Sequence, residues 1–124
     1  MLSPPSPSIR LLPCGMAPVS HHIFHPLERV ENLHDGYLKT FAAGGCDLVL
    51  TQQRGLPSIL EGICPHAGHP LSGARIVGPD LRCDMHGYRF DVHTGACTFF
   101  TEGPCRGLRV YEHAVRDGMI GVLL

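Results

Sequence analysis

The chain lacks the sequence features by which proteins enter membranes or bind nucleic acids. No stretch approaches the roughly 18 consecutive apolar residues that a membrane-spanning helix needs. Lys and Arg total 10 against 11 Asp and Glu, which gives a formal net charge of −1, and no block or stripe of basic residues occurs. Because polyanions are bound by clustered Lys and Arg, we expect neither nucleic acid nor a membrane as a partner.

Motifs that bind nucleotides are also missing. No G-x-G-x-x-G sequence follows a predicted strand, and no P-loop occurs. With 124 residues the chain has the length of one domain, and its 44% of hydrophobic residues is enough to close a core. That length leaves no room for a second catalytic domain of ordinary size. We therefore expect no catalysis on an organic substrate by this chain alone.

The first 20 residues differ in composition from the rest of the chain. They are rich in Pro and Ser, and prolines interrupt each apolar stretch that could form the centre of a secretory signal. We predict a flexible N-terminal arm over residues 1–20 and one folded domain over residues 21–124. Without a signal for export, the expected location is the cytoplasm.

A long helix is not expected either. No segment keeps the apolar period of about 3.6 residues through three helical turns, and only residues 27–33 could form one short helical turn. Turn-forming residues instead separate short apolar runs, many of them about ten residues apart. They occur at Asp35-Gly36, Gly44-Gly45, Arg54-Gly55, Gly78-Pro79-Asp80, Thr94-Gly95 and Asp117-Gly118. This pattern predicts an all-β fold, either an antiparallel β-sandwich or a small β-barrel.

Two short clusters pair a cysteine with a histidine. Cys64 is followed by His66, and after sixteen further residues Cys83 is followed by His86, which gives C-x-H and C-x-x-H. The segment between them is long enough for a hairpin that brings both loops to one end of the domain. Two Cys and two His can hold a tetrahedral zinc ion or a [2Fe–2S] centre. Zinc fingers usually place both cysteines on one knuckle and both histidines on a helix, whereas each loop here carries one of each. The mixed pairing favours the iron–sulfur centre.

Taken with their neighbours, these clusters resemble the Rieske domain. The resemblance rests on Cys64-Pro65-His66-Ala67-Gly68 with Leu71, and on Cys83-x-x-His86-Gly87-Tyr88-Arg89-Phe90-Asp91 followed by Thr94-Gly95. A weaker third element, Gly103-Pro104-Cys105, is similar to the loop that covers the cluster in that family. The resemblance spans residues 22–124 and implies a Rieske-type fold with two cluster-binding loops at one end. It implies one [2Fe–2S] cluster per chain, held by Cys64, His66, Cys83 and His86.

Other positions in the loops indicate the kind of Rieske protein. High-potential respiratory Rieske proteins add a cysteine to each loop and join the loops by a disulfide, but the matching positions here hold His69 and Met85. Those proteins also carry serine and tyrosine hydroxyls that bond to sulfur, where this chain has Tyr88 and Phe90. Fewer donors leave the reduced state less stabilised. We therefore expect a potential near the low end of the Rieske range of about −150 to +300 mV.

The two loops also predict the backbone conformation of their glycines and the exposure of their histidines. Gly68 and Gly87 are expected to adopt positive φ or to let the backbone pass close to the cluster. His66 and His86 should lie at the tip of the domain with their outer nitrogens near solvent, beside a modestly apolar docking rim. That rim would consist of Pro65, His69, Pro70, Met85 and Pro104. Cys97 and Cys105 could pair across the third loop, although free thiols are expected in a reducing cytoplasm.

The resemblance implies a soluble Rieske ferredoxin of the bacterial aromatic-ring dioxygenase type. Such a monomeric one-electron carrier would accept electrons from an NAD(P)H-dependent flavoprotein reductase and pass them to a terminal oxygenase or another redox enzyme. Two alternatives remain open at this point. One is a Rieske-like small subunit of a larger enzyme such as nitrite reductase, and the other is a structural zinc-binding interaction module.

Overall fold

The computed structural model of the protein describes residues 23–66 and 68–124, and the described part is built almost wholly of β-strands. The strands are β1 (Phe24–Arg29), β2 (Leu38–Ala43), β3 (Cys46–Gln53), β4 (Leu56–Glu61), β5 (Ile63–Cys64), β6 (His69–Pro70), β7 (Arg75–Val77), β8 (Asp80–Arg82), β9 (Arg89–Asp91), β10 (Cys97–Phe99), β11 (Val110–Tyr111), β12 (His113–Arg116) and β13 (Met119–Leu123). The all-β prediction is confirmed, whereas the arm predicted over residues 1–20 lies outside the described residues. No helix within the described ranges is long and apolar enough to cross a membrane.

Helical structure is limited to two short 3-10 turns in the part of the chain that the structure describes. The turn η2 (Val30–Asn32) falls inside the stretch in which the sequence predicts one short helical turn. The second, η3 (Leu71–Gly73), follows β6 directly. Each turn begins from an extended residue and closes with a backbone hydrogen bond of the i to i+3 type, so neither continues into an α-helix.

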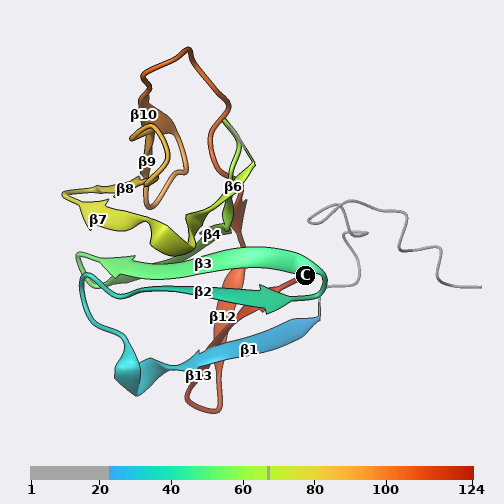
Figure 1. Ribbon diagram of the computed structural model, residues 1–124. Coiled ribbons are helices and arrows are strands. Elements are labelled where there is room, and N and C mark those ends of the chain that lie inside the picture. Colours follow the sequence, from blue (N-terminus) through green and yellow to red (C-terminus); the bar gives the residue numbers. More distant parts are fainter. Residues whose placement is uncertain (1–22, 67) are drawn as a thin grey trace, which may run out of the picture.

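The strands form three main antiparallel sheets, which Figure 1 shows one above another. The lowest sheet has the order β1-β13-β12, the middle sheet has the order β11-β4-β3-β2, and the upper sheet has the order β10-β9-β8-β7. A two-stranded ribbon of β5 and β6 lies beside the upper sheet. The lowest sheet therefore combines the first described strand with the last two, and the central part of the chain forms the upper sheet.

Several hairpins close through the turns that the sequence predicts. In Gly44-Gly45, Arg54-Gly55 and Asp117-Gly118 both turn residues have positive φ, between 52° and 79°. Two consecutive residues of this kind match the right-handed twist of the flanking strands in a two-residue hairpin. These turns therefore fix the register of β2 with β3, β3 with β4, and β12 with β13.

The middle sheet is buried on both faces, so it separates two hydrophobic cores. Successive side chains of a strand point to opposite faces. Val49 and Leu60 accordingly pack upward, whereas Leu48, Leu50 and Ile59 pack downward. The upper core consists of Val49, Leu60, Cys64, Leu71, Leu81, Cys83, Tyr88, Phe90, Val92 and Leu108. The lower core consists of Tyr37, Cys46, Leu48, Leu50, Ile59, Tyr111, Ile120 and Val122.

Candidate metal centre

The first of the two loops with a Cys and a His is a tight turn between β5 and β6. Cys64 pairs with His69 across this ribbon, and the Gly68 N–H donates to the Cys64 carbonyl at 2.9 Å. Gly68 has a φ of +68°, as the sequence predicts for this glycine. The turn leaves Cys64 only 1% exposed in the upper core and carries His66 toward the surface.

The second loop runs from Cys83 to Tyr88, between β8 and β9. The Cys83 N–H donates to the Tyr88 carbonyl at 2.8 Å and closes the loop. Gly87 has the predicted positive φ, but His86 also has a φ of +69°, which the sequence did not indicate. A residue with a side chain adopts this left-handed conformation at a cost, and such residues gather at functional sites. In this loop Cys83 is buried, whereas the His86 side chain is 41% exposed.

The two thiols are buried in the same upper core. Burial, together with a smaller contribution from the neighbouring Cys64 thiol, raises the pKa of the Cys83 thiol to about 11. The Met85 N–H, which donates to Cys83 Sγ at 3.4 Å, acts in the opposite direction. Both cysteines are free. A metal that binds thiolates would therefore displace protons from this site.

The two imidazoles lie edge to face, with ring centroids 5.1 Å apart. Tyr88 stacks on His66 at 4.1 Å and holds that ring in place from behind. In this position the Nδ1 atom of His66 is buried and has no hydrogen-bond partner. Because a buried polar atom without a partner is costly, this nitrogen is arranged for a ligand. The donor set of two thiols and two imidazoles therefore fits a Rieske-type cluster, in which one iron takes two Cys and the other two His.

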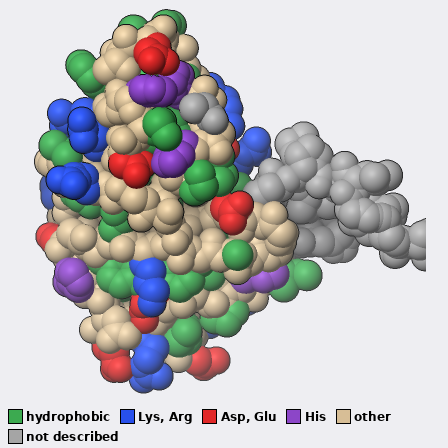
Figure 2. All heavy atoms as spheres, in the orientation of Figure 1, with side chains coloured by type: hydrophobic (Ala, Val, Ile, Leu, Met, Phe, Trp, Pro, Cys, Tyr) green, Lys and Arg blue, Asp and Glu red, His purple; other side chains and the backbone are tan. Residues whose placement is uncertain are grey.

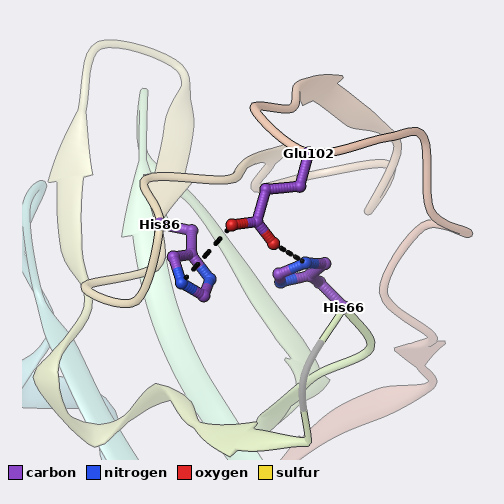
Figure 3. A group of neighbouring side chains, drawn as sticks. All are labelled: His66, His86 and Glu102. Atoms are coloured by element: carbon purple, nitrogen blue, oxygen red, sulfur yellow. Dashed lines mark hydrogen bonds and ion pairs between the residues drawn. The ribbon is translucent and has the colours of Figure 1, made fainter.

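A third loop, between β10 and β11, brings a carboxylate over both histidines (Figure 3). Glu102 Oε1 lies 3.0 Å from the Nε2 atom of His66, and Oε2 lies 3.6 Å from the Nε2 atom of His86. Ligand atoms of these three residues lie within 4.8 Å of one another, close enough to share a cation. A cation on these outer atoms would, however, leave the buried His66 Nδ1 without a partner and both thiols unused.

Sequence reasoning missed Glu102, although it noted the Gly103-Pro104-Cys105 element that follows directly. This loop is anchored to the second loop and to the middle sheet. The Tyr88 hydroxyl donates to the Gly103 carbonyl at 2.6 Å. Arg106, which departs from the residues expected in this loop, donates to both carboxylate oxygens of Glu61 at 2.8 Å. The departure thus supplies an attachment to β4.

The positions that carry a disulfide in respiratory Rieske proteins are occupied differently here. His69 Nε2 lies 3.0 Å from Asp84 Oδ1, so a polar contact joins the first two loops in the described structure. Met85 is 37% exposed at the tip. Cys97 and Cys105 are free thiols with their sulfurs 3.8 Å apart, which agrees with the expectation that they do not pair.

The expectation that both histidines lie near the surface is confirmed. The His86 side chain is 41% exposed and that of His66 is 17% exposed. Figure 2 shows histidine and acidic side chains together at the upper end of the molecule. The outer nitrogen of each ring faces Glu102, so an exposed acidic side chain lies at this tip together with the exposed Met85.

Comparisons with known proteins agree with this geometry. The family model described as "Rieske [2Fe-2S] domain" matches residues 24–112. Chlorophyllide a oxygenase of Chlamydomonas reinhardtii is 32% identical over 105 residues, which cover 82% of this chain but only 16% of the oxygenase. The ferredoxin of Sphingomonas yanoikuyae B1 has a TM-score of 0.70 at 24% identity, covering 81% of this chain and 97% of the ferredoxin. The ferredoxin of carbazole 1,9a-dioxygenase from Nocardioides aromaticivorans IC177 has a TM-score of 0.70 at 23% identity, covering 80% and 95%. The chain belongs to the Rieske [2Fe–2S] domain family, which implies a Rieske-type [2Fe–2S] cluster as its cofactor.

Proposed function

We propose that Cys64 and Cys83 hold one iron of this cluster and that His66 and His86 hold the other. The burial of both thiols in the same core and the unpartnered Nδ1 atom of His66 support this assignment. Both outer Nε2 atoms face Glu102, which leaves the Nδ1 atom of each ring for the metal. Each iron would thus take one ligand from the first loop and one from the second.

We infer that the chain is a monomeric one-electron carrier. A Rieske cluster takes up and releases single electrons. The observation that carries the proposal is the asymmetry of the four ligands: the cysteines are at most 1% exposed, whereas the His86 side chain is 41% exposed. An electron therefore has its shortest route to a partner through the imidazole edges, while the buried thiolates are shielded from solvent.

The form of carrier that we favour is a Rieske ferredoxin. The chain matches almost the whole length of two ferredoxins, whereas it covers 30% of the terminal oxygenase of carbazole 1,9a-dioxygenase. A similar ferredoxin fold occurs in a complex of reduced oxygenase and oxidised ferredoxin in carbazole 1,9a-dioxygenase. We propose that this chain accepts electrons from an NAD(P)H-dependent flavoprotein reductase and passes them to a terminal oxygenase in the cytoplasm.

The tip suits a transient partner. Pro65, His69, Pro70, Met85 and Pro104 would form the rim around the exposed imidazoles, and Met85 is the exposed large hydrophobic residue among them. A small apolar rim with acidic neighbours binds weakly, and weak binding lets the partner leave after each electron.

A low potential is also part of the proposal. Phe90 has no hydroxyl, and the Tyr88 hydroxyl donates to the Gly103 carbonyl, so neither side chain is placed as a donor to sulfur. Among the described contacts at the two cysteines, the Met85 N–H is a backbone donor to Cys83 Sγ. Fewer donors stabilise the reduced form less, which places the potential toward the low end of the Rieske range.

The proposal is tested with purified protein loaded with iron and sulfide. We expect two irons per chain, a red-brown visible spectrum and uptake of one electron in a reductive titration. NADH should bleach the spectrum only when a flavoprotein reductase of an aromatic-ring dioxygenase system is added, and the matching oxygenase should restore it. A colourless protein that retains zinc instead of iron would contradict the proposal and favour a structural zinc module.

A second role has one observation in its favour. Chlorophyllide a oxygenase, the relative with 32% identity over 82% of this chain, is an oxygenase much longer than this chain. As a Rieske domain of such an enzyme, the chain would pass its electron to an iron in an attached domain. Reduction of a separate oxygenase by the purified chain distinguishes the ferredoxin from this role and from a nitrite reductase subunit.

A further inference from the structure

We propose that Glu102 is a positioning residue for the metal centre, and that its carboxylate lowers the reduction potential by accepting a hydrogen bond from the outer nitrogen of His66 and by placing its negative charge beside the outer nitrogen of His86. This inference rests on the proposed assignment of His66 and His86 as ligands. It concerns a residue outside the C-x-H and C-x-x-H clusters, in a loop far along the chain.

The contact geometry differs between the two rings. The 3.0 Å separation between Glu102 Oε1 and His66 Nε2 is a hydrogen bond, in which the imidazole N–H donates to the carboxylate. The 3.6 Å separation between Oε2 and His86 Nε2 is too long for a hydrogen bond, so it acts through charge. One carboxylate thus lies beside the outer nitrogens of both rings, with one oxygen directed toward each ring, as Figure 3 shows.

The backbone around Glu102 is fixed relative to the histidines. Its N–H donates to the Tyr88 hydroxyl at 3.2 Å, and that hydroxyl donates in turn to the Gly103 carbonyl. The Thr101 hydroxyl donates to the His86 carbonyl at 2.9 Å. Both Tyr88 and His86 belong to the second loop. The carboxylate is therefore built into the site and is not a side chain that reaches the histidines from a free loop.

This arrangement has two effects on a metal held by the other ring nitrogens. A carboxylate that accepts from Nε2–H fixes the proton there, orients the ring and makes the imidazole a stronger donor to metal. Its negative charge also opposes the arrival of an electron at the same centre. Both effects favour the oxidised form. The Glu102 side chain is 54% exposed, so water screens part of the charge and the effect is moderate.

The test is the midpoint potential of Glu102→Gln, measured by spectroelectrochemistry on iron-loaded protein. Glutamine keeps the length and an acceptor oxygen but removes the charge. We expect the equilibrium constant for reduction to rise about tenfold, which for a one-electron couple is about 59 mV upward. The g values of the reduced protein should shift as well, because they report the imidazole ligands. The matched control is Glu31→Gln, which removes the same charge from the turn η2, outside the three loops.

The outcomes separate the inference from the proposed function. A variant with full iron content and an unchanged potential would overturn the inference while the carrier assignment stands. If Glu102→Gln loses its iron, the potential is measured on Glu102→Asp, whose shorter side chain keeps the charge but does not span both rings. A smaller upward shift is then expected, and no shift would overturn the inference. A wild-type protein without a [2Fe–2S] cluster would contradict the proposed function itself.

Discussion

The upper and lower halves of the molecule are stabilised in different ways. The lower half, formed by β1, β12 and β13 with the lower core, has long antiparallel registers and a two-residue hairpin with the expected turn geometry. The upper half, formed by β5 to β10 and the three loops, has strands of two or three residues. It also contains a histidine with positive φ, two free and buried thiols and a buried imidazole nitrogen without a partner.

From this difference we expect the two halves to depend on the bound group to different degrees. The strands of the lower half pair with one another and enclose their own core, so we expect this half to fold without a cofactor. The upper half holds two buried free thiols and the unpartnered Nδ1 atom of His66, so we expect binding of a metal centre to stabilise it. The middle sheet belongs to both cores and joins the halves.

The largest expected effect comes from removing a ligand. Cys64→Ser or His86→Ala should leave little intact cluster, because an iron with an open ligand position is exposed to solvent. Iron content and the visible spectrum measure the loss. Amide hydrogen exchange should meanwhile remain slow in β1, β12 and β13, because the lower half does not depend on the metal.

Cys97→Ser is the matched control for this prediction. It removes a free, partly buried thiol that packs against the upper core but lies outside the first two loops. The control should retain both irons. His86→Ala with a full visible spectrum would refute the ligand assignment, and uniform unfolding of the whole domain would refute the independence of the lower half.

A smaller effect is expected from the hydroxyl that ties the third loop to the second. Tyr88→Phe keeps the ring stacked on His66 but removes the bonds with Gly103 and Glu102. Two such hydrogen bonds contribute about 1–3 kcal/mol together. We expect a lower thermal midpoint and faster proteolysis within the third loop.

Tyr37→Phe is the control in the lower half, where the Tyr37 hydroxyl donates to Glu28. It should also lower the thermal midpoint but leave cluster release by a chelator unchanged. Equal rates of cluster release in the Tyr88→Phe and wild-type proteins would show that the third loop does not protect the metal centre.

The polar contact between the first two loops should matter less again. His69→Ala removes the partner of Asp84, and this partly exposed pair is worth about 0–1 kcal/mol. We expect slightly faster bleaching of the cluster by a chelator, with little change in thermal unfolding. His93→Ala, which truncates a histidine outside the loops, should bleach at the wild-type rate. Equal bleaching rates in the His69→Ala, His93→Ala and wild-type proteins would show that the contact between His69 and Asp84 does not take the place of a disulfide between the loops.

The same contrast explains how far the sequence could predict the structure. The turn pairs and the short apolar runs between them carry their own local signal, so the all-β fold and the hairpins could be predicted from them. The sequence also shows that Leu48, Val49 and Leu50 are consecutive apolar residues. That such a run is buried on both faces of the sheet depends on a second core, which no local rule predicts. Cys64, His66, Cys83 and His86 were found because their spacing is itself a chemical signal.

What the sequence could not supply were contacts between distant segments. Glu102 lies 36 residues from His66, and one exposed glutamate in a loop has no distinguishing pattern. The positive φ of His86 was hidden because this conformation is usually expected of glycine. The contacts of Tyr88 could not be predicted from the sequence either. Its ring and hydroxyl have separate partners on two different loops, and only the folded arrangement shows both.

The smallest predicted effect concerns the stability of the lower half at acid pH. Glu28 accepts bonds from the Tyr37 hydroxyl, the Asn32 amide and the Arg29 N–H, which lower its pKa from 4.5 to about 2. Since the pKa is lower in the folded state, the ionised carboxylate stabilises the fold above about pH 4.5, and this contribution is lost as the pH falls toward 2.

The thermal midpoint of Glu28→Gln should therefore fall less steeply than that of the wild-type protein between pH 5 and about pH 2. Some decrease will remain, because the pKa values of Asp35 and Asp91 are also lowered by hydrogen bonds from backbone N–H groups. Glu31→Gln is the control, since it removes a neighbouring carboxylate that pairs with Arg29 on the surface. Thermal midpoints recorded at half-unit pH steps give the comparison. Equal slopes in the Glu28→Gln and wild-type proteins would show that this cluster of hydrogen bonds does not stabilise the lower half, whatever happens at the metal centre.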